Sequence, residues 1–286
     1  MIKDITLAHS PDADDIFMYA AINFGWLGDE FNFKNKALDI QSLNEKALNS
    51  EYCISAISFA LYPLIANEYA LLRTAMSFGE GYGPKLVKKI GKTLKQNFKV
   101  ALSGAHTTNA LIFKLKYPNA RIIYKNFLEI ESAILNDEAD AGVLIHENIL
   151  DFDKNLCIEA ELWDIWHDLA PNLPLPLGGM AIRRSIPLSD AIKIEKILTK
   201  AVDLAYNNKN ILNQMLIERN LIRVDKDKLE IYLNLYANKN SICMNDIQKK
   251  ALDRLFELGL EAGFYKNIIK TDNFLIPIEY EKLRNL

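Results

Sequence analysis

The sequence predicts a two-lobed α/β protein with a helical C-terminal region. Over the first two-thirds of its 286 residues, short apolar runs alternate with longer amphipathic segments, and the alternation starts again near residue 97. The remaining C-terminal part has an almost entirely helical pattern. Strands that alternate with helices indicate βα units and a largely parallel sheet, and two such blocks in succession indicate two lobes. One large doubly wound sheet is the alternative.

The first block contains the elements of one lobe. We expect strands at 5–8, 38–40 and 54–57, helices at 14–24, 44–49 and 59–67, and extended segments at 71–77 and 85–89. Apolar residues at helical spacing, such as Ile16, Phe17 and Phe24, support the first helix. Residues 79–84, Gly-Glu-Gly-Tyr-Gly-Pro, have the composition of a turn.

The second block repeats this pattern, and the C-terminal part then changes character. We expect strands at 99–102, 121–124, 141–145 and 180–183, and helices at 107–115, 128–136, 210–219, 226–236 and 246–260. A long helix capped by Ser189 or Asp190 should run through Ala205, and Gly263 should end the last helix. The proline-rich stretch at 171–178 is the best candidate for a boundary.

Composition excludes several classes of protein. The 34 basic and 37 acidic residues leave a net charge of −3, which argues against a nucleic-acid partner. The three cysteines, Cys53, Cys157 and Cys243, are too far apart for a CxxC metal site and predict no disulfide framework. The sequence contains neither a signal-peptide pattern nor an apolar stretch of transmembrane length, so we expect a cytoplasmic protein without a membrane partner.

Polar residues that could carry chemistry follow several predicted strands. His146 comes directly after the apolar run 142–145, at the kind of strand end where open α/β sheets bind ligands. A structural histidine is an equally weighted alternative. Thr107 and Thr108 follow His106 at the start of a helix, where peptide N–H groups and hydroxyls can hold an anion or where one threonine caps the helix. Ser58 begins another helix after the strand at 54–57.

The first strand-to-helix turn is acidic. It reads Ser10-Pro11-Asp12-Ala13-Asp14-Asp15, and its carboxylates could bind a divalent cation, although helix capping by one or two of them is favoured. Turns of this kind on two facing lobes would form a cleft for a small polar or anionic molecule. The sequence contains no phosphate-binding loop, nucleophile elbow, dinucleotide fingerprint or HExxH motif.

Taken in order, these turns resemble those of the 1,4-dihydroxy-6-naphthoate synthases of the futalosine route to menaquinone. The segments that carry the resemblance are 10–17 (SPDADDIF), 42–44 (SLN), 57–59 (ISF), 81–84 (GYGP), 104–108 (GAHTT), 142–147 (GVLIHE) and 173–178 (LPLPLG). Each segment alone is weakly specific, but their joint order is specific, and they span residues 10 to 178.

The resemblance implies a type II periplasmic-binding-protein-like fold, with 1–96 and 178–286 in lobe 1 and 97–177 in lobe 2. It implies a carbon–carbon lyase that converts cyclic dehypoxanthinyl futalosine, a small-molecule carboxylate, into 1,4-dihydroxy-6-naphthoate with no cofactor or metal. His146 matches the histidine proposed as general base in that family. The implied substrate-binding residues are Ala56, Ile57, Ser58, Thr107, Thr108, Asn44 and Asp15.

The chain departs from the family pattern in two places. The first turn of the family commonly reads Ser-Pro-Cys-Pro-Asn-Asp, so Asp12 and Asp14 add carboxyl groups here, and Ala56 stands where a lysine is often found. The alternatives are the sister enzyme chorismate dehydratase, a cytoplasmic binding protein of the same fold without catalytic activity, and a structural scaffold without a ligand.

Overall fold

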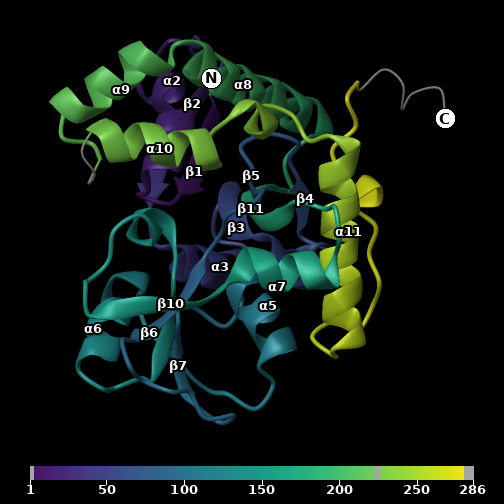
Figure 1. Cartoon of the computed structure of the whole chain (residues 1–286). Helices are drawn as coiled ribbons and strands as arrows, with labels where there is room; N and C mark the ends of the chain where they lie inside the picture. Colours follow the sequence, from purple (N-terminus) through teal and green to yellow (C-terminus); the bar gives the residue numbers. More distant parts are fainter. Residues whose placement is uncertain (1–2, 223–225, 280–286) are drawn as a thin grey trace.

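The computed structural model describes residues 3–222 and 226–279, and these form two β-sheets surrounded by helices (Figure 1). The first sheet has the order β2-β1-β3-β11-β4, with β5 paired to β11. Its strands are β1 (Lys3–His9), β2 (Phe31–Ala37), β3 (Ile54–Ser58), β4 (Tyr69–Leu71), β5 (Ser77–Gly79) and β11 (Leu175–Arg183). β1 runs parallel to β2 and β3, whereas β11 runs antiparallel to β3, β4 and β5.

The second sheet has the order β10-β6-β9-β7-β8. Its strands are β6 (Lys85–Lys89), β7 (Lys99–Leu102), β8 (Arg121–Tyr124), β9 (Ala141–Leu144) and β10 (Leu156–Glu161). β7 pairs in parallel with β8 and β9, and β6 pairs antiparallel with both β9 and β10. Two sheets and a helical C-terminal region confirm the predicted fold class, although both sheets are mixed because β6 and β11 run against their neighbours.

The chain passes between the sheets twice. It leaves the first sheet after β5 and enters the second at β6, and it returns through α7 (Leu162–Leu169) into β11. The proline-rich stretch at 171–178 is therefore partly strand, with Pro176 opposite Phe78. β6 pairs in the second sheet although it precedes residue 97, so sheet pairing favours an earlier limit for the second lobe than 97. The division at 96/97 and 177/178 stays a prediction.

One predicted strand is wrong. Residues 38–40 are not a strand, because Asp39 caps α3 (Ile40–Leu48) by accepting hydrogen bonds from the backbone N–H groups of Gln41 and Ser42. The strand that precedes α3 is β2, an edge strand that is mostly exposed and carries lysines. Edge strands of this kind lack a continuous apolar run, which explains why periodicity missed it.

The helices cover the sheets, and some of them contribute residues to the pocket described below. They are α1 (Ala13–Met18), α2 (Ala20–Asn23), α4 (Tyr62–Ile65), α5 (Thr108–Lys116), α6 (Ile130–Leu135), α8 (Leu188–Asn207), α9 (Lys209–Glu218), α10 (Lys226–Tyr236) and α11 (Asp246–Glu261). The short 3₁₀ segments are η1 (Phe59–Leu61), η2 (Phe127–Glu129), η3 (His146–Ile149), η4 (Lys239–Ser241) and η5 (Thr271–Phe274). α8 and α10 both pack on α1, and α11 packs on β11.

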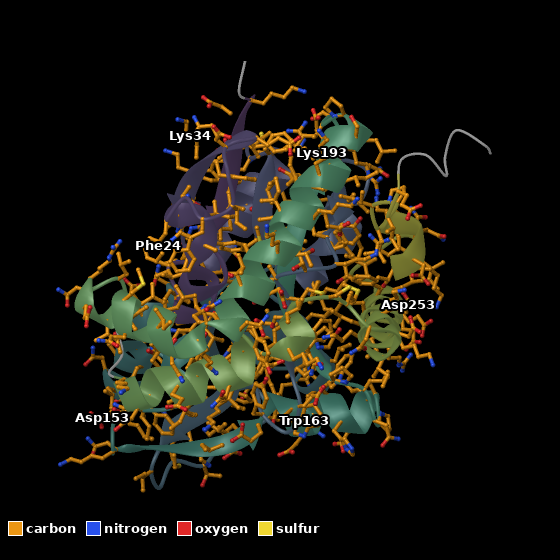
Figure 2. The ribbon with its side chains drawn as sticks, turned by 90° about the horizontal axis from the view of Figure 1, so that it is seen from above. Phe24, Lys34, Asp153, Trp163, Lys193 and Asp253 are labelled. Carbon is orange, nitrogen blue, oxygen red and sulfur yellow. The ribbon has the colours of Figure 1, made fainter. Side chains whose placement is uncertain are left out.

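The long helix α8 begins earlier than predicted. Its N-cap residue is Pro187, so Ser189 and Asp190 lie inside the first turn and the predicted cap is wrong. Asp190 instead forms an ion pair with Lys3 of β1 at 2.5 Å. Figure 2 shows Lys193 of α8 and Lys34 of β2 at the same end of the molecule, away from Trp163 of α7. The predicted role of Gly263 agrees with its left-handed backbone, φ +78°, directly after the cap of α11.

β9 is buried along its whole length and leads directly to His146. A Cβ atom at Gly142 would lie 2.5 Å from Cγ2 of Ile130 and 3.0 Å from Cδ1 of Ile134, both on α6. Glycine at this position therefore lets α6 pack closely on the strand that positions the histidine.

We expect Gly142→Ala to destabilise the fold by about 1–3 kcal/mol, because the added methyl group overpacks a buried interface. The free energy of unfolding in urea measures this loss. In an Ile130→Ala background the same substitution should cost less, since the clashing branch is gone. Equal costs in the two backgrounds would show that the close packing of α6 is not the reason for this glycine.

Candidate functional site

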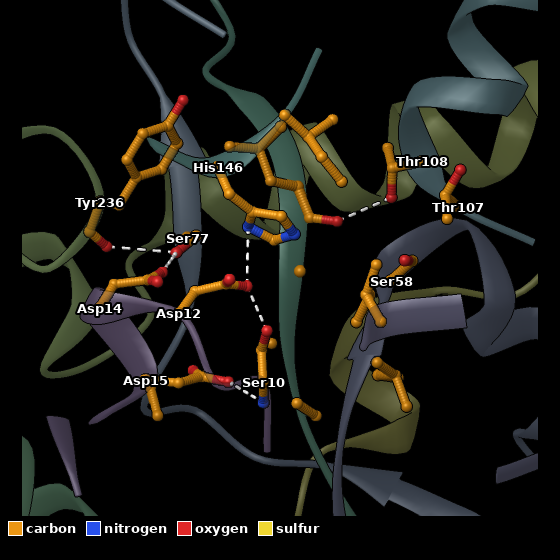
Figure 3. A pocket seen from close by; sticks show the side chains of 18 of the residues that line it. Ser10, Asp12, Asp14, Asp15, Ser58, Ser77, Thr107, Thr108, His146 and Tyr236 are labelled. Atoms are coloured by element: carbon orange, nitrogen blue, oxygen red, sulfur yellow. Dashed lines mark hydrogen bonds and ion pairs between the residues drawn. The ribbon is translucent and has the colours of Figure 1, made fainter. Parts of the chain in front are cut away.

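A pocket that is partly open to solvent lies between turns that belong to the two sheets, and together with the open solvent at its mouth it comprises about 790 Å³ (Figure 3). Its polar lining comprises Ser10, Asp12, Asp14, Asp15, Ser58, Ser77, Thr107, Thr108, Asn109, His146, Tyr232 and Tyr236. Among the described residues that line it there is no lysine or arginine. Figure 3 shows the aspartates on one side of His146 and Ser58, Thr107 and Thr108 on the other.

His146 is held in a strained and specific orientation. It is the first residue of η3 and has a left-handed backbone, φ +55°, which costs a residue other than glycine about 1–3 kcal/mol. Such a conformation persists only where neighbouring groups hold it. The imidazole packs edge-on against Phe127, with ring centroids 4.9 Å apart, and its Nδ1 lies 2.9 Å from Oδ2 of Asp12.

The Asp12 side chain contacts His146 and Ser10 in the pocket and does not cap the helix that follows it. Asp12 occupies the N-cap position of α1, but its side chain makes no capping hydrogen bond, so the predicted capping role is wrong for this residue. The carboxylate is 1% exposed, contacts His146 and accepts a hydrogen bond from the Ser10 hydroxyl. Asp14 and Asp15 lie in the first turn of α1, where acidic residues complement the helix dipole.

Asp14 connects α1 to β5 and α10. Its carboxylate accepts hydrogen bonds from the hydroxyls of Ser77 at 3.2 Å and Tyr232 at 3.3 Å. The rings of Tyr232 and Tyr236 pack 4.7 Å apart and both line the pocket. Sequence reasoning missed Ser77 and the two tyrosines, because an amphipathic pattern shows that a helix face is buried but not which cavity it borders.

The Asp15 carboxyl is held toward its neutral form. Its Oδ2 accepts a hydrogen bond from the backbone N–H of Ser10 at 2.7 Å, which favours the charged form. Burial raises its pKa well above 3.8, the neighbouring carboxylates of Asp14 and Asp12 act in the same direction, and His146 opposes them. In the described part of the chain, no group of three or more His, Cys, Asp and Glu side chains is arranged to hold a metal ion.

The two threonines lie at the N-terminus of α5, but their hydroxyls are engaged within the protein. Thr107 caps the helix by accepting from the backbone N–H of Ala110 at 3.4 Å. The Thr108 hydroxyl donates to the carbonyl of Leu177 at 2.8 Å and accepts from the backbone N–H of Ala60 at 3.1 Å. Thr108 thereby ties α5 to η1 and to β11 of the first sheet. The peptide N–H groups in the first turn of α5 are therefore the hydrogen-bond donors that would bind an anion there.

The remaining predicted binding residues cluster at the end of β3. Ala56, Ile57 and Ser58 line the pocket. Asn44 is fully buried and does not belong to the lining, but its amide donates to the Ser58 hydroxyl at 3.0 Å and accepts from the Ser58 backbone N–H at 2.9 Å. The structure thus brings together every predicted site residue except Asn44, which reaches the pocket only through Ser58.

The other histidines lie outside the pocket lining. Burial and, to a smaller extent, the charge of Lys114 lower the pKa of His106, which stands beside the turn before α5. Burial also lowers the pKa of His9, whose Nδ1 is 2.7 Å from the carbonyl of Ser10. His167 packs against Trp163 on α7. His146 is therefore the histidine that the described residues place in the pocket.

Two β-sheets with flanking helices, whose facing turns border one pocket, define a type II periplasmic-binding-protein-like protein. The periplasmic aliphatic sulphonate binding protein of Escherichia coli has this fold and aligns with a TM-score of 0.65 at 10% identity, covering 96% of this chain and 92% of its own. A crystal structure of an Archaeoglobus fulgidus protein aligns with a TM-score of 0.85 at 31% identity, covering 91% and 98%.

Residues 5–261 match the menaquinone biosynthesis family, and the chain belongs to that family. A curated relative from Thermus thermophilus, named 1,4-dihydroxy-6-naphthoate synthase, is 22% identical over 256 residues, which cover 89% of this chain and 93% of the relative. These findings confirm the resemblance drawn from the turns. None of the helices that the structure describes has the length and apolar character needed to span a membrane.

We expect Asp15→Asn to flatten the pH dependence of stability. Because the pKa of the Asp15 carboxyl is raised on folding, the native state keeps a proton that the unfolded chain has released, and stability falls as pH rises from about 4 through the raised pKa. Asparagine has no proton to lose, so the variant should be more stable relative to the wild type at the alkaline end of this window than at its acidic end.

Urea unfolding across this pH range measures the effect. Asp39→Asn makes the same chemical change at the cap of α3, outside the pocket lining, and serves as the matched control variant. If the free energy of unfolding of Asp15→Asn and of the wild type changed in parallel with pH, the Asp15 carboxyl would not retain its proton in the folded state.

Proposed function

We propose that the protein is a 1,4-dihydroxy-6-naphthoate synthase, a carbon–carbon lyase that converts cyclic dehypoxanthinyl futalosine into 1,4-dihydroxy-6-naphthoate. Membership of the menaquinone biosynthesis family and the names of the curated relatives support this activity. The observation that carries it is the imidazole of His146, which lines the pocket between the turns of the two sheets and pairs with a buried carboxylate.

In this proposal His146 is the general base. Its Nδ1 contacts Asp12, and its other ring nitrogen points toward the side of the pocket where Ser58 and Thr108 lie (Figure 3). That nitrogen takes a proton from the substrate carbon next to a carbonyl group. The C–H electron pair forms an enolate, and elimination then releases the sugar-derived fragment as the ring system becomes aromatic. A positioned general base contributes about 10²–10⁴-fold to such a step.

The substrate carboxylate would bind at the N-terminus of α5. With no basic side chain among the described lining residues, the peptide N–H groups of the first helical turn and the helix dipole supply the positive potential. Ala56, Ile57, Ser58, Thr107 and Thr108 would contact the substrate on this side. Asp15 would face its hydroxyl groups on the other side, and Asn44 would orient Ser58.

Further expectations accompany this function. We propose that the protein is cytoplasmic and that its binding partner is its substrate, a small-molecule carboxylate. The lobe limits and the residue roles given above are part of the same proposal.

The direct test is incubation of the purified protein with the spirocyclic substrate, followed by detection of the naphthoate chromophore. We expect turnover in the wild type and a loss of at least about 100-fold in kcat for His146→Gln, with folding and substrate binding retained. His106→Gln, which changes a histidine outside the pocket lining, should keep wild-type kcat. A near wild-type rate in His146→Gln would refute the assignment of the base.

The same assay separates the alternatives. Dehydration of chorismate in place of naphthoate formation would identify the sister activity. Binding of either compound without turnover would identify a binding protein.

A further inference from the structure

The contact between Asp12 and His146 joins the two halves of the fold. Asp12 follows β1 of the first sheet, whereas His146 follows β9 of the second sheet. The carboxylate oxygen and Nδ1 of the imidazole are 2.9 Å apart, and the two side chains are 1% and 18% exposed. Figure 3 shows this contact in a line with Ser10, whose hydroxyl donates to the same carboxylate oxygen.

We propose that Asp12 is a positioning residue for the reaction: its carboxylate holds the Nδ1–H tautomer of His146, so that Nε2 is the proton acceptor. The effect of Asp12 on kcat rests on the proposed function, whereas the tautomer of His146 does not. A carboxylate at this distance accepts only from a protonated Nδ1, and a neutral imidazole with its proton on Nδ1 has its lone pair on Nε2. Pairs of this kind fix both tautomer and ring orientation at histidine sites.

The surroundings show that Asp12 is itself held in place for this task. Ser10 donates to it from the side opposite the imidazole, and the backbone N–H of Ser10 is fixed by Asp15. The imidazole is also fixed by its edge-on contact with Phe127 and by the left-handed backbone of its own residue. A strained backbone that points a side chain at a buried carboxylate is a feature of functional sites.

The pair also stabilises the charge that forms during the proposed step. The proton leaves the substrate carbon and becomes the Nε2–H of an imidazolium, while the electron pair of the broken C–H bond enters the enolate. The Nδ1–H of the imidazolium remains hydrogen-bonded to the Asp12 carboxylate, whose negative charge offsets the new positive charge. The enolate electron pair then forms a ring C=C bond, and the carbon–carbon bond to the sugar-derived fragment breaks with its electron pair on the fragment. The imidazolium returns its proton to that fragment, so the histidine ends neutral.

Substitution of Asp12 tests this role without removing a helix cap. The side chain makes no capping hydrogen bond to α1, and asparagine keeps its volume while losing the negative charge. We expect Asp12→Asn to lower kcat for naphthoate formation about 100-fold and to change KM by less than about threefold. Asp39→Asn, the same change at the cap of α3 and outside the pocket lining, should keep both values. A kcat within about threefold of the wild type would overturn the role.

A second measurement does not depend on activity. The chain has only four histidines, so ¹⁵N-labelled imidazoles are few enough to resolve, and the His146→Gln spectrum assigns the signal of His146. At alkaline pH the wild type should show the proton of His146 on Nδ1. Asp12→Ala should move it to Nε2, the tautomer that a free imidazole prefers.

The two measurements separate the inference from the function on which it rests. Wild-type protein that makes no naphthoate but carries the Nδ1–H tautomer, lost in Asp12→Ala, would refute the proposed function and support the pairing. An Nε2–H tautomer in the wild type would overturn the pairing whatever the activity.

Discussion

The chemistry of this molecule depends on one constraint: two turns from different sheets must bring an imidazole to within hydrogen-bond distance of a buried carboxylate. The turn after β1 supplies Asp12 and the turn after β9 supplies His146. Thr108 reinforces the same junction, since its hydroxyl binds both Ala60 of η1 and Leu177 of β11. The buried strand β9 and the close packing of α6 at Gly142 support the turn that carries His146.

Charge is distributed unevenly around this junction. Aspartates gather on one side of His146, where hydroxyls of Ser10, Ser77 and Tyr232 donate to them and Asp15 is driven toward its neutral form. The opposite side presents the N-terminus of α5, which is a favourable place for an anion. A substrate with a carboxylate at one end and hydroxyl groups at the other would match both sides. The proposed substrate class rests on this match.

Periodicity predicted the buried and regular elements well, such as the strand Arg121–Tyr124 and the helix Lys226–Tyr236. It failed at β2, because an exposed edge strand has no apolar run. The meeting of several strand-end turns in one pocket was also predictable, since polar residues follow the ends of strands. The pairing of Asp12 with His146 was not, because it depends on how two sheets face one another and on a left-handed residue that no local pattern signals.

A crystal structure of the protein with 1,4-dihydroxy-6-naphthoate bound would show whether the pairing of Asp12 with His146 faces the reacting ring. We expect the carboxylate of this product at the N-terminus of α5, its ring beside Nε2 of His146, and the contact between Nδ1 and Asp12 unchanged. A product bound with its carboxylate among the aspartates, or an imidazole turned away from both Asp12 and the ring, would contradict this expectation.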